Sequence, residues 1–168
     1  MNILQMFSIS SALLCLLVTG FILTFAIVVM PGIAKLEDKE FLKAFQVTDG
    51  IIQGNQPLFL SIWLGSVISV LATMVSAVII PEFKDAWLII FVGGFYLIGV
   101  QGLTMGVHLP LNNRIKDLKI DSLDNKTLRE ERLNFEKKWN FYNTIRTVVS
   151  FVVSLCFLSV VSFPGVWA

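Results

Sequence analysis

The stretch that decides the fold covers residues 57–109 and reads PLFLSIWLGSVISVLATMVSAVII-PEFKD-AWLIIFVGGFYLIGVQGLTMGVHL. It contains two uncharged apolar runs, residues 57–80 and 86–109, separated by the short connection 81–85. A helix that crosses a bilayer needs about 20 apolar residues. So short a connection permits only a tight hairpin between neighbouring helices. The stretch therefore predicts two antiparallel transmembrane helices.

Two further apolar runs flank this pair, at residues 8–30 and 139–161. The first is uncharged, and the second contains a single charge, Arg146. No Lys or Arg precedes the first run as it would in a signal peptide, so we expect that run to be retained as a helix. We also expect proline to end three of the helices: Pro31-Gly32 closes the first, Pro81 the second and Pro110 the third.

Composition agrees with a membrane protein. Apolar residues make up 55% of the chain and charged residues 15%, whereas soluble domains have about 25% charged residues. The sequence thus predicts an all-α fold, a four-transmembrane-helix bundle that forms a single integral membrane domain over residues 1–168.

Two charged connections join the spanning segments. In residues 36–56 the apolar side chains fall broadly on one helical face and are Phe41, Leu42, Phe45, Ile51 and Ile52. Lys35, Lys39 and Lys43 repeat at intervals of four on another face. This pattern predicts an amphipathic surface helix after helix one, lying along the membrane. Residues 111–138 are rich in both signs of charge and predict a charged, solvated helical connection between helices three and four.

The cations are placed asymmetrically. Of the 13 Lys and Arg, all but Lys84 and Arg146 lie in or beside the two charged connections. The positive-inside rule then places both connections in the cytoplasm and both termini outside. We expect a bacterial cytoplasmic membrane, with the lipid bilayer as partner. The net charge of +1 offers no argument for nucleic acid or an acidic substrate.

Small residues indicate how the helices pack, since close backbone approach stabilises helix pairs in lipid. A ladder with a spacing of four runs along the second helix through Gly65, Ser69, Thr73 and Ala77. The third helix contributes Gly99, Gly102 and Gly106, of which the last two form a GxxxG motif. These faces favour a closed bundle over an oligomer.

Cys15 and Cys156 both lie in apolar runs. We expect them to pack as small apolar side chains rather than form a disulfide. The chain has a single histidine and no CxxC pair, so no Cys/His zinc site can be assembled and we expect no metal site.

Polar residues gather where helices three and four enter the same connection. Gln101, Thr104 and His108 share one helical face by their i, i+3, i+7 spacing. Trp139, Asn143 and Arg146 share a face of helix four in the same way. The candidate ligand-binding residues are Gln101, Asn112, Asn113, Trp139, Asn140, Asn143 and Arg146.

Arg146 admits two interpretations. It lies seven residues beyond Trp139, about 10 Å along the helix, where a charge costs roughly 2.5–3.5 kcal/mol at the bilayer centre. It either stretches to the headgroups or bonds carbonyls freed by Pro110, or it anchors an anionic or carbonyl-bearing ligand. Asp49 and Glu40 are its candidate carboxylate partners.

The other polar residues are also open to two readings. His108 could act as a general base, since imidazole exchanges protons near neutral pH, or it could be a hydrogen-bonded structural residue. The asparagines could hold a ligand or cap helix ends. Trp139 is adequately explained as a residue of the aromatic belt at the membrane surface.

With these residues the chain resembles the anthrone oxygenase-like family of small four-helix membrane proteins. Most bacterial members of this family are described as a domain of unknown function. The matching elements are Met30-Pro31-Gly32, Phe45-Gln46, the run from His108 to Asn113, and the set Trp139, Asn140, Asn143 and Arg146. The resemblance covers nearly the whole chain.

The resemblance implies a four-helix membrane fold and, for fungal members, oxygenation of anthrones to anthraquinones without an evident metal or flavin. We therefore expect no cofactor. In such a reaction His108 would be the candidate catalytic base, and Asn112, Asn143 and Arg146 would stabilise the enolate.

The best hypothesis is that the protein binds a hydrophobic aromatic or quinone-like small molecule near the cytoplasmic interface and acts as a cofactor-independent oxygenase. The alternative is a non-catalytic structural or partner-binding membrane subunit. A channel or transporter is disfavoured, because only one charge lies within a span and no ring of charges is evident.

Overall fold

The computed structural model describes residues 2–79 and 86–162. The predicted hairpin at residues 81–85, including Lys84, lies outside the described residues. The described parts of the chain form helices and turns without a strand, in the order α1 (Ile3–Thr24), η1 (Phe25–Val29), α2 (Met30–Ile33), α3 (Asp38–Gln53), α4 (Pro57–Ile79), α5 (Ala86–Tyr96), η2 (Leu97–Gly102), η3 (Thr104–His108), α6 (Leu109–Asp117), η4 (Ile120–Ser122) and α7 (Asn125–Ser162). The prediction of an all-α fold is confirmed.

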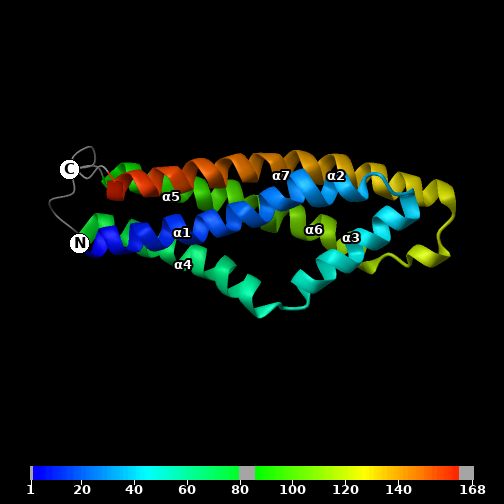
Figure 1. The fold of residues 1–168 in the computed structure, drawn as a ribbon, viewed down its shortest axis with the longest axis horizontal. Coiled ribbons are helices and arrows are strands. Elements are labelled where there is room, and N and C mark those ends of the chain that lie inside the picture. Colours follow the sequence, from blue (N-terminus) through cyan, green and yellow to red (C-terminus); the bar gives the residue numbers. More distant parts are fainter. Residues whose placement is uncertain (1, 80–85, 163–168) are drawn as a thin grey trace.

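Four helical rods run side by side in Figure 1 and are long and apolar enough to cross a membrane: Ile3–Ile33, Pro57–Ile79, Ala86–Asp117 and Asn125–Ser162. The first rod packs against α4 and α7, and α5 closes the bundle between those two helices. Large apolar side chains such as Ile98, which is 75% exposed, cover the outside of the rods. The protein is an integral membrane protein built on a four-helix bundle.

The predicted helix ends at Pro31 and Pro110 are wrong, since both helices continue past the proline to Ile33 and Asp117. In each case a π-helical segment comes directly before. The Met30 amide donates to the Phe25 carbonyl, and the Leu109 amide donates to the Thr104 carbonyl. Each proline then occupies the first turn of the following helix, where its missing N–H leaves no bond unmade.

Hydroxyl pairs and small residues hold the rods together. The Ser11 and Thr73 hydroxyls are hydrogen-bonded at 2.8 Å between α1 and α4, and Thr19 and Ser150 are bonded at 2.7 Å between α1 and α7. Ser69, Thr73 and Ala77 of the predicted small-residue ladder are buried. In lipid such contacts replace the hydrophobic drive that packs soluble helices.

The glycines of the third rod behave differently from one another. A Cβ atom on Gly99 would lie 2.9 Å from a methyl of Val149, so this glycine permits close approach of the third rod to α7. Gly102 and Gly106 are exposed, and a Cβ on Gly106 would meet nothing within 4 Å. The GxxxG motif is therefore not a contact within this bundle.

Both cysteines are free. Cys15 is fully buried in the core of the bundle, beside the apolar side chains of Val18 and Tyr96. This confirms that Cys15 packs as a small apolar side chain.

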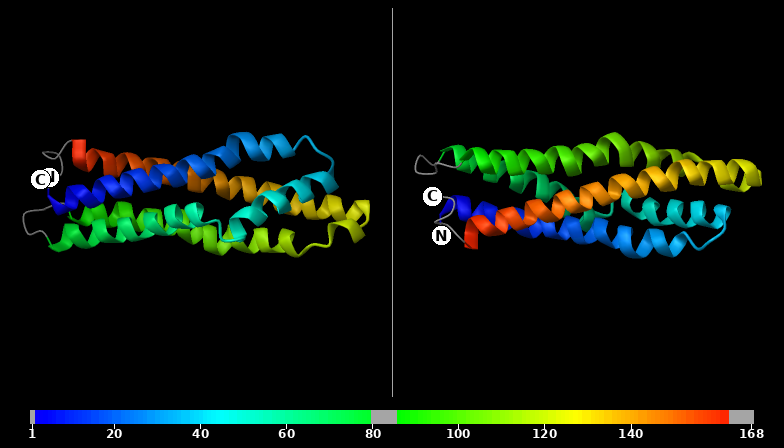
Figure 2. Two further views of the ribbon diagram at one scale, coloured as in Figure 1. Left: turned by 60° about the horizontal axis from the view of Figure 1, so that its bottom comes forward. Right: turned by 90° about the horizontal axis from the view of Figure 1, so that it is seen from above.

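One end of the molecule extends beyond the bundle. With 38 residues, α7 is about 57 Å long, well beyond the roughly 30 Å of a hydrocarbon core. Its first half groups with α3 and α6 (Figure 2). The charged helical connection predicted between helices three and four is formed by α6, η4 and this half of α7.

The predicted amphipathic helix is α3. Its side chains Phe41, Leu42 and Phe45 are 0–1% exposed, because α6 and α7 cover this face. The Phe45 and Phe135 rings meet edge to face with centroids 4.4 Å apart. The apolar face thus packs against protein, whereas Ile51 near the end of the helix is exposed.

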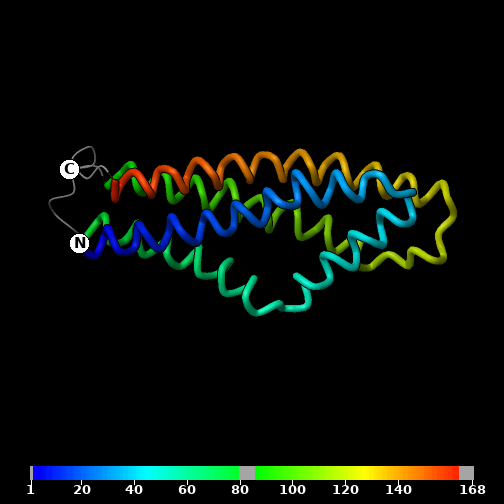
Figure 3. Tube along the Cα trace, in the orientation of Figure 1, coloured from blue at the N-terminus to red at the C-terminus, as the bar shows by residue number. Residues whose placement is uncertain are grey.

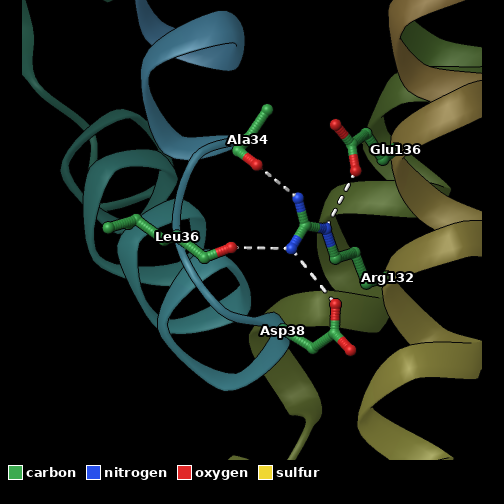
Figure 4. Close-up of polar contacts among 5 residues, drawn as sticks. All are labelled: Ala34, Leu36, Asp38, Arg132 and Glu136. Carbon is green, nitrogen blue, oxygen red and sulfur yellow. Dashed lines mark hydrogen bonds and ion pairs between the residues drawn. The ribbon is translucent and has the colours of Figure 1, made fainter.

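Arg132 of α7 fastens the turn between α2 and α3 (Figure 4). Its guanidinium donates to the carbonyls of Ala34 at 2.7 Å and Leu36 at 2.8 Å, and it pairs with the Asp38 and Glu136 carboxylates. These bonds satisfy carbonyls that the end of α2 leaves unpaired. The turn is therefore tied directly to the long helix.

The turn between α3 and α4 bends the chain so that the two helices meet at an angle (Figure 3). Asn55 has φ of 61°, in the left-handed region that asparagine tolerates better than most residues. The Gln56 side chain then accepts a hydrogen bond from the Phe59 amide and caps α4.

Replacing Gly99 tests the packing. We expect Gly99→Leu to destabilise the bundle by about 1–3 kcal/mol, the usual cost of overpacking, because its Cβ alone would lie 2.9 Å from a Val149 methyl. Gly106→Leu, in the neighbouring π-helical segment, is the matched control and should leave stability unchanged. Thermal unfolding in detergent, followed by circular dichroism, measures both. Equal melting temperatures for the two variants would contradict the packing described.

Candidate functional site

A cavity of about 470 Å³ lies among the first rod, the end of α3, the first half of α4, the third rod and α7. Ligand pockets usually measure about 300–1,000 Å³. Its lining residues are Phe21, Ile22, Phe25, Asp49, Ile52, Gln53, Phe59, Leu60, Trp63, Leu64, Val67, Gln101, Thr104, Met105, His108, Leu109, Asn112, Trp139 and Arg146. One wall is apolar and largely aromatic, and the other carries polar side chains.

π-helical turns shape the polar wall. Gln101 lies in η2, and Thr104 and His108 lie in η3. All three side chains line the cavity, so the face predicted from their spacing is confirmed. Wide turns of this kind inside α-helices occur frequently at functional sites.

His108 is the least satisfied polar side chain of the cavity. It is 2% exposed, and neither ring nitrogen has a hydrogen-bond partner among the residues that the structure describes. The Trp139 ring meets it edge to face, with centroids 5.1 Å apart. Buried polar atoms are nearly always hydrogen-bonded, so this imidazole is available to a ligand.

Arg146 lies on the same wall and is 7% exposed. Its Nε donates to Asn143 Oδ1 at 2.9 Å, and one Nη donates to Thr104 Oγ1 at 3.1 Å. A guanidinium carries five N–H donors, and these are its only bonds to the described part of the protein. Such burial contradicts the reading in which the side chain stretches to the headgroups. Neither partner is a backbone carbonyl, so the reading in which Arg146 bonds carbonyls freed by Pro110 is also wrong.

Asn143 positions Arg146 from outside the cavity. Its amide nitrogen donates to the Ile22 carbonyl at 3.1 Å, while its oxygen accepts from the guanidinium. Asn143 does not line the cavity. Its place between α1 and α7 makes it a positioning residue for Arg146.

A second hydrogen-bond chain crosses the cavity from α3 to α7. The Asp49 carboxylate accepts from Gln53 at 2.6 Å and from Asn112 at 2.8 Å. The Asn112 oxygen in turn accepts from Trp139 Nε1 at 3.0 Å. Burial raises the pKa of Asp49, and these hydrogen bonds oppose that shift.

Two further predictions concern this part of the site. Trp139 is 2% exposed and packs in the core beside Phe25 and Phe135, so its interpretation as an aromatic-belt residue is wrong. Asp49 shares the cavity with Arg146, but within the described residues the two form no ion pair of 4 Å or less. Glu40 is exposed on α3.

The structure brings together most of the candidate residues. Gln101, His108, Asn112, Trp139 and Arg146 line the cavity, and Asn143 adjoins it. Asn113 is exposed and Asn140 is half-buried, and neither lines the cavity.

The sequence analysis did not predict the contributions of α1, α3 and α4 to the cavity. Gln53 was not among the candidate site residues, and Asp49 was expected only as a carboxylate partner of Arg146. Their spacing of four at the end of an amphipathic helix was an available signal. The aromatic residues of α1 and α4, which form the apolar wall, gave no signal that separates them from other lipid-facing side chains.

Together, the fold and the cavity define a class: a four-helix membrane protein with a ligand-sized pocket, apolar on one side and polar on the other. Residues 54–156 match the family described as anthrone oxygenase. Since this match covers more than half of the chain, the protein belongs to the anthrone oxygenase family. No curated protein and no solved structure matches the chain.

The matched region contains His108, Asn112, Trp139 and Arg146. It begins after Met30-Pro31-Gly32 and Phe45-Gln46, so the family match does not extend to these two N-terminal motifs. In the described residues no group of three or more His, Cys, Asp and Glu side chains could hold a metal ion.

Replacing Asn143 tests its positioning role. Asn143→Leu leaves the Ile22 carbonyl and the Arg146 Nε without their partner, and an unsatisfied buried polar group costs about 1–3 kcal/mol. We expect a lower melting temperature in detergent. Asn140→Leu, one turn earlier on α7, is the matched control, because the side-chain amide of Asn140 makes no hydrogen bond to the described residues. A stable Asn143→Leu protein would show that this bond is dispensable for the fold.

Proposed function

We propose that the protein binds a hydrophobic aromatic ketone or quinone-like molecule in the cavity and acts on it as a cofactor-independent oxygenase. The observation that carries the proposal is the pairing of His108 with the incompletely bonded Arg146 on the polar wall of the cavity, opposite an aromatic wall. Neither ring nitrogen of His108 has a partner in the described residues. The family supports the type of reaction, since its description is anthrone oxygenase.

Binding follows from the two walls of the cavity. A planar aromatic ligand packs against Phe21, Phe25 and Phe59 on the apolar side. Its ketone oxygen accepts hydrogen bonds from the open N–H groups of Arg146. Aromatic contacts and a few placed donors are the usual combination in ligand pockets.

The proposed chemistry begins with proton abstraction. His108 takes one proton from the methylene carbon of an anthrone, and the electron pair moves onto the ketone oxygen. Arg146, held by Asn143 and Thr104, stabilises this enolate, as preorganised donors do for developing oxyanions. Asn112 has one amide hydrogen that is not used by Asp49 and adds to the same polar wall.

Molecular oxygen completes the reaction. It accepts electrons from the enolate and forms a bond to the former methylene carbon, and the proton on His108 passes to the peroxide. The hydroperoxide then loses its terminal hydroxide together with the remaining proton on that carbon, as water. One oxygen molecule is consumed, one water is released, and the methylene becomes the second ketone of an anthraquinone.

Oxygen uptake by proteoliposomes supplied with anthrone tests this function. We expect His108→Ala to lower turnover by about 10²–10⁴-fold, the usual contribution of a general base, while the ligand still binds. Arg146→Met should weaken binding as well as turnover. Asn134→Ala, at an exposed position on α7, is the control. Undiminished turnover in His108→Ala would remove the proposed role of this residue.

We further propose that the charged connections face the cytoplasm of a bacterial cell and that both ends of the chain face outside. The cation distribution supports this orientation through the positive-inside rule. In Figure 1 the start of α1 and the end of α7 lie at one end of the molecule, with α3 and the α6–α7 connection towards the other.

Cysteine labelling in spheroplasts checks the orientation. A membrane-impermeant maleimide should label Ile3→Cys directly but label Lys126→Cys only after the membrane is permeabilised. Both positions are exposed, and the unmodified protein gives the background from Cys15 and Cys156. The opposite labelling pattern would reverse the proposed topology.

A further inference from the structure

A second hollow adjoins the cavity on the outside of the bundle. This groove measures about 630 Å³ and lies between the middle of the first rod, the end of α3 and the beginning of α4. The described residues that line it are apolar apart from Thr48 and Gln56, and none of them is charged. Its rim is open, since Val47, Ile51 and Leu58 are 64–70% exposed.

The groove and the cavity lie directly against each other. They share the lining residues Phe21, Phe25, Ile52, Phe59 and Trp63. At this junction the Phe21 and Phe59 rings are 4.8 Å apart, and the Phe59 and Trp63 rings are 5.4 Å apart. The two hollows thus share one set of aromatic side chains, with polar groups on the far wall of the cavity and an apolar groove at the surface of the bundle.

We propose that the groove holds the apolar chain of an amphiphilic ligand whose aromatic head group occupies the cavity. The ligand class is a lipid-soluble quinone or phenol that carries a long alkyl or prenyl chain. This inference rests on the proposed function of the cavity as an aromatic binding site.

The dimensions and chemistry fit such a ligand better than a phospholipid. The groove follows the first rod from Leu17 to Phe25, a distance of about 12 Å at the helical rise. Among the residues that the structure describes, Arg146 is the one cation that lines either hollow, and it lies on the polar wall of the cavity. To reach it, any head group must pass the shared aromatic side chains. An aromatic ring packs favourably against such side chains, whereas a phosphate would lose its hydration there.

The groove acts by accommodating the chain rather than by attracting it. Lipid chains are as apolar as the groove, so a ligand chain gains little from leaving the bilayer. The open rim lets the head group reach His108 while the chain remains in an apolar environment. Filling the groove should therefore hinder ligands with a chain and spare those without one.

A matched pair of naphthoquinones tests the inference in nanodiscs. Menadione and phylloquinone have the same ring system, and phylloquinone adds a phytyl chain. Quenching of tryptophan fluorescence reports binding, because Trp63 and Trp139 both line the space. We expect Val47→Phe and Leu58→Phe each to weaken phylloquinone binding roughly tenfold, equivalent to about 1.4 kcal/mol, and to leave menadione binding unchanged.

Val78→Phe is the control. Val78 is 63% exposed on α4, as Leu58 is 65% exposed, but it lies outside the groove. Phylloquinone binding that is equally strong in the groove variants and the control would overturn the inference, as would a wild-type protein that binds menadione but excludes phylloquinone. Loss of a co-purified phospholipid from the groove variants, with phylloquinone unaffected, would assign the groove to a lipid instead. Failure of both quinones to bind the wild type would overturn the proposed function of the cavity as well.

Discussion

A guanidinium buried among membrane helices must find its hydrogen-bond partners within the protein, because the surrounding hydrocarbon offers none. Arg146 imposes this constraint here. Asn143 and Thr104 supply two of its bonds, and Asn143 reaches across to the Ile22 carbonyl. The meeting of α1, the third rod and α7 at one depth therefore depends on this one charge. The imidazole of His108, which has no hydrogen-bond partner in the described part of the chain, lies on the same cavity wall.

The helices could be predicted from the sequence because uncharged runs of this length have few structural alternatives. The helix ends at Pro31 and Pro110 could not, since the rule that proline ends a helix assumes regular α-helical hydrogen bonding. Here each proline follows a π-helical segment. Whether a turn widens depends on packing between helices, which the local sequence does not record.

The candidate site was partly predictable for a similar reason. Spacing along one helix identified the shared face of Gln101, Thr104 and His108, which line the cavity together. Contributions from other helices were not predictable in this way. Asp49 and Gln53 come from α3, and whether that helix meets the site depends on the turn at Asn55. Trp139 was misjudged because its indole bonds Asn112, a partner from another helix.

Because α7 is one continuous helix, the directions in which its side chains point around the helix axis are fixed relative to one another. Arg132, which clamps the turn before α3, Trp139 and Arg146 are separated by seven residues each, so they follow one coiled-coil-like seam from the charged half into the membrane half. Each residue advances an α-helix by about 100°. A single insertion between Arg132 and Arg146 would turn one out of register with the other. The clamp at the turn before α3 and the wall of the cavity are therefore locked to the same angular setting, although they lie in different halves of the helix.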